Sequence, residues 1–102
     1  MQYAIKLTCW EFNRPSPYNV TVDKRFDTEN AAMEEIERMV NAELATLNEG
    51  RELEPVYDSD GDIVCHEFPF RGDYDGEHTA IVRFWDGDDY RNVTAYDIKK
   101  EP

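Results

Sequence analysis

The sequence predicts an α+β fold in which one helix, at about residues 28–49, packs on one face of an antiparallel β-sheet of five to six strands. Three observations support this prediction: period-two alternation early in the chain, an apolar stripe at helical spacing, and two later hairpin signals. The expected order of elements is ββαββββ. A length of 102 residues suits one hydrophobic core, so we expect a single domain over residues 1–102.

Two strands are expected before the helix. Apolar and polar side chains alternate over residues 3–10 and again over 18–23, which is typical of half-buried strands. Between them, Pro15 and Pro17 remove backbone donors and fix the chain direction, so this segment cannot continue a strand. We therefore expect the two strands to pair as a hairpin around the proline loop.

The helix is the clearest element. Thr28 is its expected N-cap, with Asp27 as the competing candidate, and Gly50 stands where a left-handed C-terminal cap is expected. Between these ends, apolar residues recur at spacings of three and four, which predicts one face directed at the sheet. The stripe consists of Met33, Ile36, Val40, Leu44 and Leu47.

Four strands are expected after the helix. Residues 53–57 and 63–68 flank an Asp-Ser-Asp-Gly turn, and Pro55 confines the first of these strands to an edge. Residues 79–85 and 90–98 flank the sequence Asp-Gly-Asp-Asp, which predicts the last hairpin. A polar, glycine-containing loop is expected between the two hairpins.

The register of the last hairpin decides which residues face the helix. Pairing of Trp85 with Tyr90 places five apolar residues on the helix face. They are Ala80, Val82, Phe84, Val93 and Ala95. The opposite face then carries Lys6, Thr8, Trp10, Arg25, Ile81, Arg83, Trp85 and Tyr90. Aromatic residues and arginine are enriched at interfaces, so part of this face is a candidate contact surface. The candidates are Trp10, Arg83, Trp85 and Tyr90.

No motif of a known catalytic or cofactor site is present. The sequence lacks phosphate-binding glycine loops, a nucleophile elbow and a metalloprotease helix motif. Acidic pairs are abundant, and nothing in the sequence singles out one of them for general acid–base chemistry. We therefore expect a protein that is not an enzyme, with no catalytic residues and no cofactor.

Two possible metal sites fail on their spacing. Residues 56–67 match part of a calcium loop, but Val56 stands where the first carboxylate ligand belongs, and Pro55 is incompatible with a flanking helix. The other candidate ligands lack the short paired spacings of zinc sites. They are Cys9, Cys65, His66 and His78. We expect an acidic hairpin turn and no metal site.

Acidic residues are concentrated in the middle of the chain. The formal net charge is −12, and residues 27–62 alone carry twelve acids against only Arg38 and Arg51. The resulting field repels nucleic acid and anionic lipid, and it attracts basic protein surfaces over about 8 Å at physiological salt. We therefore expect no direct binding to nucleic acid or membranes. Without a transmembrane run or a recognisable signal peptide, the expected location is the cytoplasm.

Carboxylates of the helix and of two acidic turns are the candidate partner-binding groups. They are Glu34, Glu35, Glu49, Asp58, Asp60, Asp62, Asp86, Asp88 and Asp89. Presented together, these groups would compete with nucleic-acid phosphates for the basic groove of a partner protein.

The chain resembles small phage and mobile-element inhibitors of nucleic-acid defence enzymes, the anti-restriction and anti-CRISPR proteins. The resemblance lies in its length, in the segment from Asp27 to Asp62 with its formal charge of −10, and in the acidic turn at residues 85–89. It implies a DNA-mimic inhibitor. The alternative is a small accessory interaction module, or a homodimer, that uses the aromatic sheet face and owes its acidity to solubility.

Overall fold

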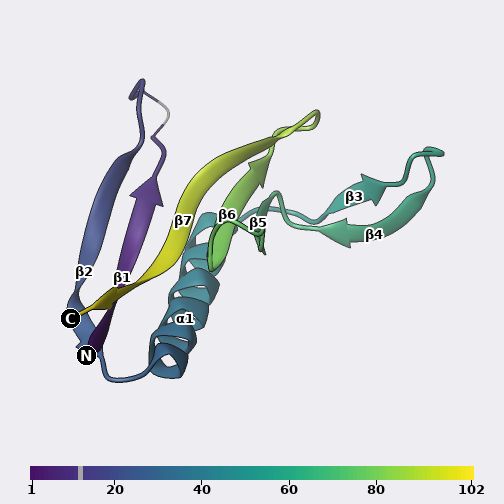
Figure 1. Ribbon diagram of the computed structural model, residues 1–102. Helices are drawn as coiled ribbons and strands as arrows, with labels where there is room; N and C mark the ends of the chain where they lie inside the picture. Colours follow the sequence, from purple (N-terminus) through teal and green to yellow (C-terminus); the bar gives the residue numbers. More distant parts are fainter. Residues whose placement is uncertain (12) are drawn as a thin grey trace.

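The structure is a computed structural model that describes residues 1–11 and 13–102. Within this range, the chain forms seven strands and one helix. They are β1 (Gln2–Cys9), β2 (Tyr18–Phe26), α1 (Glu29–Leu47), β3 (Glu54–Tyr57), β4 (Ile63–Glu67), β5 (Phe70–Asp73), β6 (Ala80–Trp85) and β7 (Tyr90–Glu101). Five strands form an antiparallel sheet in the order β2-β1-β7-β6-β5, with α1 on one face, while β3 and β4 form a separate two-stranded sheet (Figure 1).

The predicted α+β class and the antiparallel sheet with one helix are confirmed. The described residues form seven strands, rather than five to six, because β5 occupies part of the predicted polar loop. Glycine and aspartate are depleted in strands, so the local sequence of β5 gives little sign of it. Pairing with β6 makes the strand: Phe70 pairs with Phe84, and Gly72 pairs with Val82.

Helix α1 begins where its sequence predicts, but it ends at Leu47, two residues earlier than predicted, with Asn48 and not Gly50 as the C-cap next to its last turn. The side-chain oxygen of Thr28 accepts a hydrogen bond from the Ala31 amide at 3.1 Å, so Thr28 is the N-cap. After the helix, Gly50 adopts a φ of 75°, a conformation that favours glycine. One member of the predicted apolar stripe is wrong. Met33 is exposed, and Ala32 is buried instead. The buried residues of the helix are Ala32, Ile36 and Val40, which are spaced by four, so the centre of the apolar face follows these positions.

The hydrophobic core lies between α1 and the sheet. Ile36 and Val40 of the helix form one buried cluster with Ile5 from β1, Val82 from β6 and Tyr96 from β7. Full burial of an apolar side chain of this size contributes roughly 1.5–3 kcal/mol. This cluster joins the helix to the three central strands and is the main apolar contribution to stability.

A β-bulge changes the predicted register of the last hairpin. Trp85 pairs with Tyr90 as predicted, but the register shifts immediately after Val82. Val82 therefore pairs with Thr94 and not with Val93. A single extra residue in one strand reverses the facing of every residue beyond it, and the sequence gives no sign of the insertion.

The bulge moves Ala95 to the face opposite the helix, which corrects its predicted position. Ala95 pairs there with Ile81, and Tyr96 takes the place on the helix face. Ile81 lies on the predicted face, yet both it and Ala95 are fully buried. The sheet face opposite the helix is therefore partly covered.

Polar contacts hold the loop at residues 74–79 on this second face. The Asp75 carboxylate accepts a hydrogen bond from Arg83 at 3.3 Å, and Nδ1 of His78 lies 2.9 Å from Oδ2 of Asp97. Arg83 and Asp97 both belong to the face opposite the helix, because they alternate with helix-facing residues in β6 and β7. These two contacts bring the loop over part of that face.

A buried hydrogen bond links the helix to β7. The hydroxyl of Tyr96 donates to Oε1 of Glu43 at 2.8 Å. Burial and the adjacent carboxylate raise the pKa of Tyr96 well above its ordinary value, so the hydroxyl keeps its proton. Glu43 is therefore a structural residue of the fold.

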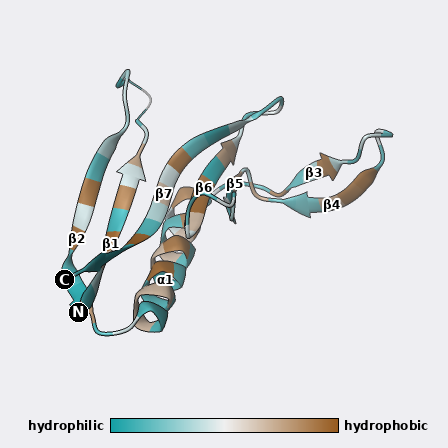
Figure 2. Ribbon diagram, viewed as in Figure 1, coloured by the Kyte–Doolittle hydropathy of each residue, from teal (hydrophilic) through white to brown (hydrophobic). Residues whose placement is uncertain are grey.

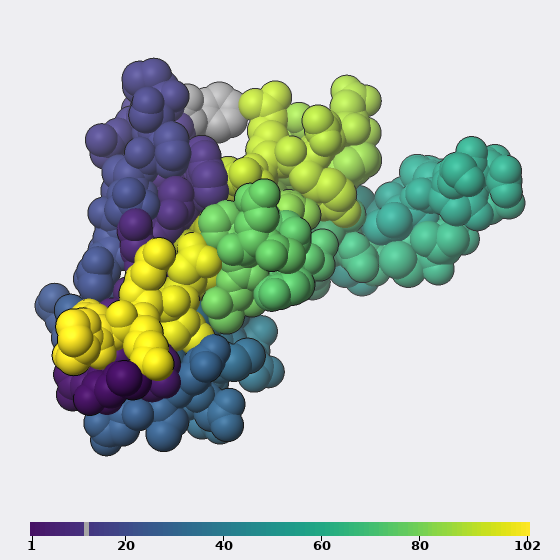
Figure 3. Space-filling model, viewed as in Figure 1, coloured from purple at the N-terminus to yellow at the C-terminus, as the bar shows by residue number. Residues whose placement is uncertain are grey.

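The β3–β4 hairpin extends away from the larger sheet (Figures 1 and 3). We call residues 52–67 the arm. The molecule measures 50 × 30 × 27 Å, and its radius of gyration of 15.4 Å exceeds the roughly 13 Å of a compact chain of this length. Among the described residues, no helix has both the length and the apolar character needed to cross a membrane.

We expect Gly72→Val to weaken the packing of α1 on β5. A Cβ atom at Gly72 would lie 3.1 Å from Cδ1 of Leu44 and 3.1 Å from Cγ1 of Val40, so the larger side chain must push the helix away. Overpacking of this kind costs about 1–3 kcal/mol. Urea unfolding should show this loss in the free energy of unfolding, with a smaller loss for Gly72→Ala. Equal stability of Gly72→Val and the wild type would contradict the close contact.

Candidate functional site

The arm concentrates negative charge in one projecting element. Residues 52–67 contain six acids and neither lysine nor arginine. The acids are Glu52, Glu54, Asp58, Asp60, Asp62 and Glu67, and all six are exposed. All four lysines lie in β1, β2 and β7, whereas the arm leads directly into β5 at the opposite edge of the sheet. The fold thus separates the acidic arm from the lysines.

The turn at the end of the arm is held by its own backbone and by Asp58. Oδ1 of Asp58 accepts hydrogen bonds from the amides of Asp60 and Asp62, at 2.9 and 3.0 Å. The Asp58 amide donates to the carbonyl of Asp62, and Gly61 adopts a φ of 85° that suits glycine. One carboxylate therefore orders the turn, and the carboxylates of Asp60 and Asp62 remain exposed on a fixed loop.

Apolar side chains accompany this charge near the end of the arm. Tyr57, Ile63 and Val64 have relative exposed surfaces of 58%, 53% and 60%. Tyr57 pairs with Ile63 across the hairpin, and Val64 is the extra residue at the bulge in β4. The distal end of β4 is accordingly coloured as hydrophobic in Figure 2. We call these three residues the apolar cluster of the arm.

Arg71 fixes the base of the arm. Its guanidinium donates to the carbonyl of Phe68 at 2.9 Å and to the hydroxyl of Tyr90 at 2.7 Å, and it forms an ion pair with Glu67 at 3.1 Å. It also lies 5.9 Å from the ring centroid of Trp85 and 5.6 Å from that of Tyr90. One side chain thus joins the end of β4 to the β6–β7 hairpin.

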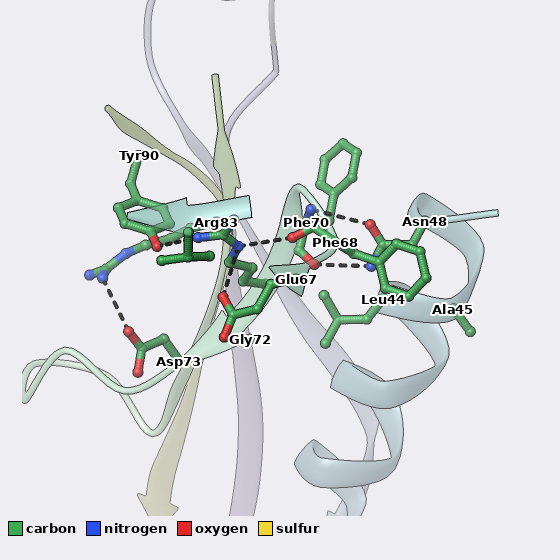
Figure 4. Close-up of a pocket in the computed structure, with 12 residues that line it drawn as sticks. Leu44, Ala45, Asn48, Glu67, Phe68, Phe70, Gly72, Asp73, Arg83 and Tyr90 are labelled. Atoms are coloured by element: carbon green, nitrogen blue, oxygen red, sulfur yellow. Dashed lines mark hydrogen bonds and ion pairs between the residues drawn. The ribbon is translucent and has the colours of Figure 1, made fainter. Parts of the chain in front are cut away.

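Asn48 attaches the other side of the base to the helix. Its side chain donates to the carbonyl of Phe70 at 3.0 Å and accepts from the Phe70 amide at 3.2 Å, as Figure 4 shows. Arg51 lies over the Phe70 ring, 4.8 Å from its centroid. These contacts join the segment just before the arm to β5, which follows the arm, and neither Arg71 nor Asn48 was predicted from the sequence. The Phe68-Pro69-Phe70 segment could have indicated an anchor at this point of the sequence, because it places apolar rings beside both residues.

The predicted partner-binding carboxylates occupy three separate elements. Glu34 and Glu35 belong to the first half of α1, which points away from the arm in Figure 1, and Glu49 follows the end of the helix. Glu35 forms an ion pair with Arg38, and this contact lowers the pKa of the Glu35 carboxyl. The nine residues therefore do not make one continuous surface, because the helix directs its first half away from the arm.

The β6–β7 turn contains the remaining three candidates. Asp86 accepts hydrogen bonds from Arg91 and from the amides of Asp88 and Asp89, so its carboxylate organises the turn. The Asp88 and Asp89 side chains are exposed. Gly87 of this turn and Tyr57 of the arm border one hollow of about 470 Å³. This turn therefore lies beside the arm, unlike Glu34 and Glu35 in the first half of α1.

The aromatic contact surface predicted from the sequence is divided in the structure. Trp85 and Tyr90 pack against each other with ring centroids 4.9 Å apart and ring planes tilted by 58°, close to Arg71. Trp10 instead borders a different hollow, with Phe70 and Phe84. The prediction placed it on the face opposite the helix, but Phe70 and Phe84 share the helix side of the sheet with Gly72. The remaining candidate, Arg83, forms ion pairs with Asp73 and Asp75.

One group of described residues combines three possible metal ligands. Ligand atoms of Asp75, Glu77 and His78 lie within 4.8 Å of one another. The Asp75 carboxylate already accepts hydrogen bonds from the amides of Glu77 and His78, and the Arg83 cation lies beside it. A guanidinium at this position opposes the binding of a second cation. We therefore assign the group to the folding of its loop.

The two cysteines lie in different sheets. Cys9 belongs to β1 and is half-buried, whereas Cys65 belongs to β4 and is exposed, and both are free thiols. Cys65 is exposed because β4 lies outside the larger sheet.

Comparison of the chain with protein-family models, with curated proteins and with solved structures gave no match.

Arg71→Met should loosen the arm. The variant keeps a long apolar stem but loses the guanidinium hydrogen bonds to Phe68 and Tyr90, each worth about 0.5–1.5 kcal/mol. Hydrogen exchange should therefore become roughly tenfold faster or more at the amides of β3 and β4, while α1 changes little. Arg38→Met, which removes an exposed helical ion pair, is the matched control. Unchanged exchange in the arm of Arg71→Met would show that Arg71 does not hold its base.

Asp86→Asn should reduce stability in a pH-dependent way. Hydrogen bonds from Arg91 and from the amides of Asp88 and Asp89 lower the pKa of Asp86 to about 2 in the folded protein, from an ordinary 3.8. A depressed folded pKa stabilises the fold above the unfolded pKa, and this contribution is lost as the pH falls through the folded value. The stability difference between wild type and variant should stay constant above about pH 5 and shrink between pH 4 and 2. Urea unfolding across this pH range measures the difference in the free energy of unfolding, and Asp88→Asn is the control. A difference that does not change with pH would contradict the prediction.

Proposed function

We propose that this protein is a non-enzymatic inhibitor whose acidic arm occupies the basic, nucleic-acid-binding groove of a partner protein in the cytoplasm. The observation that carries the proposal is the arm itself, with six exposed acids and no lysine or arginine on a projecting hairpin. The proposal assigns the protein to the same functional type as the anti-restriction and anti-CRISPR proteins that its sequence resembles.

The spacing of the charges along the arm supports mimicry of nucleic acid. Strands rise about 3.3 Å per residue, so a hairpin of this size spans roughly 20 Å from base to turn. Glu67 is paired with Arg71, and the other five carboxylates over that length give about one charge per 4 Å. One strand of duplex DNA carries a charge every 3.4 Å or so along its axis. The arm therefore offers a phosphate-binding groove a density of negative charge similar to that of one DNA strand.

The ordered turn favours binding because it reduces the entropy lost on association. Asp58 holds the backbone of residues 58–62, and Arg71 holds the base, so the exposed carboxylates are already positioned. Preorganised surfaces lose less conformational freedom when they bind. Asp88 and Asp89 lie on the neighbouring turn and extend the acidic surface toward the body of the protein.

The alternative function, self-association through the aromatic sheet face, has weaker support. Trp85 and Tyr90 are engaged with Arg71 at the base of the arm, and Trp10 lies elsewhere. The aromatic residues therefore do not present one common surface.

Neutralising three acids of the arm should weaken inhibition. The test variant is Glu54→Gln/Asp60→Asn/Asp62→Asn, and the control Glu29→Gln/Glu34→Gln/Glu37→Gln changes the net charge equally at exposed positions of α1. Both are compared in displacing labelled duplex DNA from purified restriction enzymes and CRISPR effector nucleases. The arm variant should inhibit at least about tenfold more weakly, equivalent to roughly 1.4 kcal/mol, and the control should stay within about twofold.

Salt provides the second measurement. Inhibition by the wild type should weaken strongly between about 0.05 and 0.5 M salt, because ionic screening shortens the range of the arm's field. Equal losses of inhibition in the arm variant and the helix variant would show that net charge, and not the arm, causes the inhibition. A wild type that displaces DNA from none of the enzymes at low salt would refute the proposal.

A further inference from the structure

The apolar cluster of the arm is not explained by the folding of the chain. Tyr57, Ile63 and Val64 each expose more than half of their surface, and all five residues of β4 are exposed. An isolated two-stranded hairpin is marginally stable in water, and large exposed apolar residues reduce solubility. The cross-strand pair of Tyr57 and Ile63 helps the hairpin to form, yet more than half of each residue stays exposed, and Val64 at the bulge lies outside the paired register.

The bulge in β4 gathers these residues. The register of the hairpin shifts between Val56 and Tyr57, so β4 contains one residue more than β3 along this stretch. Two apolar residues, Ile63 and Val64, therefore stand opposite Tyr57 alone. Bulges of this kind redirect side chains and are common at binding sites.

Acids surround the cluster. Asp58 and Asp62 are the chain neighbours of Tyr57 and Ile63, and Asp60 lies in the turn between them. An apolar centre with a charged rim is the usual anatomy of a protein–protein interface, in which the centre supplies affinity and the rim supplies orientation and rate. The partner surface that fits this arrangement has the inverse composition.

We infer that the arm binds by inserting Tyr57, Ile63 and Val64 into an apolar slot flanked by lysines and arginines on the partner protein. The inference rests on the proposed function and specifies how the partner's groove is recognised. Charge complementarity identifies the occupant as a basic protein. A second copy of this chain is disfavoured, because pairing two arms would bring together two clusters of six acids.

Two model peptides of equal charge test the inference. The first alternates lysine with leucine, as Lys-Leu-Lys-Leu-Lys-Leu-Lys, and the second replaces each leucine with serine. Each is titrated into the isotopically labelled protein at low salt, and NMR shifts report affinity and location. The leucine peptide should bind about tenfold more tightly or better, with the largest shifts at the apolar cluster.

Ile63→Ser/Val64→Ser is the test variant, because it removes apolar surface and leaves every acid in place. It should bind both peptides with equal affinity. Val20→Ser is the matched control, since Val20 is an exposed β-branched residue on the edge strand β2, outside the arm. It should keep the preference for leucine. The NMR spectra also show whether each variant keeps its fold.

The other outcomes separate this inference from the proposed function. Equal binding of both peptides by the wild type would overturn the apolar slot and leave a purely electrostatic inhibitor. Failure of both peptides to bind at low salt would count against the acidic arm as a binding surface altogether. A dimer in sedimentation that disappears with Ile63→Ser/Val64→Ser would overturn the basic partner in favour of a second copy.

Discussion

The packing of Ile36 and Val40 against the central strands is the interaction on which the rest of the structure depends. A helix of 19 residues is roughly 28 Å long and has one apolar stripe, so it can cover only one face of one sheet. Every element outside that contact must be held in another way. Polar contacts serve this purpose at three places: Arg83 and His78 hold a loop on the second sheet face, Arg71 holds the base of the arm, and Asn48 joins the helix to β5.

The elements with a strong local signal were predictable from the sequence. The Thr28 cap, the helical stripe and the first two strands depend on neighbouring residues alone, and the structure confirms them except at Met33, which is exposed. Features that depend on distant partners were not predictable. The bulge after Val82 shifts the facing of Ala95, and β5 forms only because β6 lies beside it. The separation of the arm from the larger sheet was likewise not predictable, because it depends on where the packing of α1 against that sheet ends.

The candidate site was predictable in composition but not in arrangement. Counting acids identified both acidic turns, yet it could not distinguish carboxylates that organise a turn from carboxylates that face solvent. Asp58 and Asp86 belong to the first kind, since each accepts hydrogen bonds from amides two or more residues ahead. Aspartate at the first position of a turn commonly has this role, so the structural role of Asp58 and Asp86 could have been predicted from the sequence. The ion pair between Glu35 and Arg38 was harder to predict, because Glu34 stands at i,i+4 spacing and competes with Glu35 for the same arginine.

An arm that combines acids with apolar side chains has different binding properties from an arm that carries charge alone. Long-range attraction raises the association rate toward any basic surface, and salt or nucleic acid easily competes with it. Apolar burial acts only at contact and mainly slows dissociation, so it selects among the basic proteins that the field has brought near. The bulge that gathers Ile63 and Val64 beside the acidic turn places both effects within one hairpin. Selectivity for one partner can then arise from three side chains, while the acids remain general.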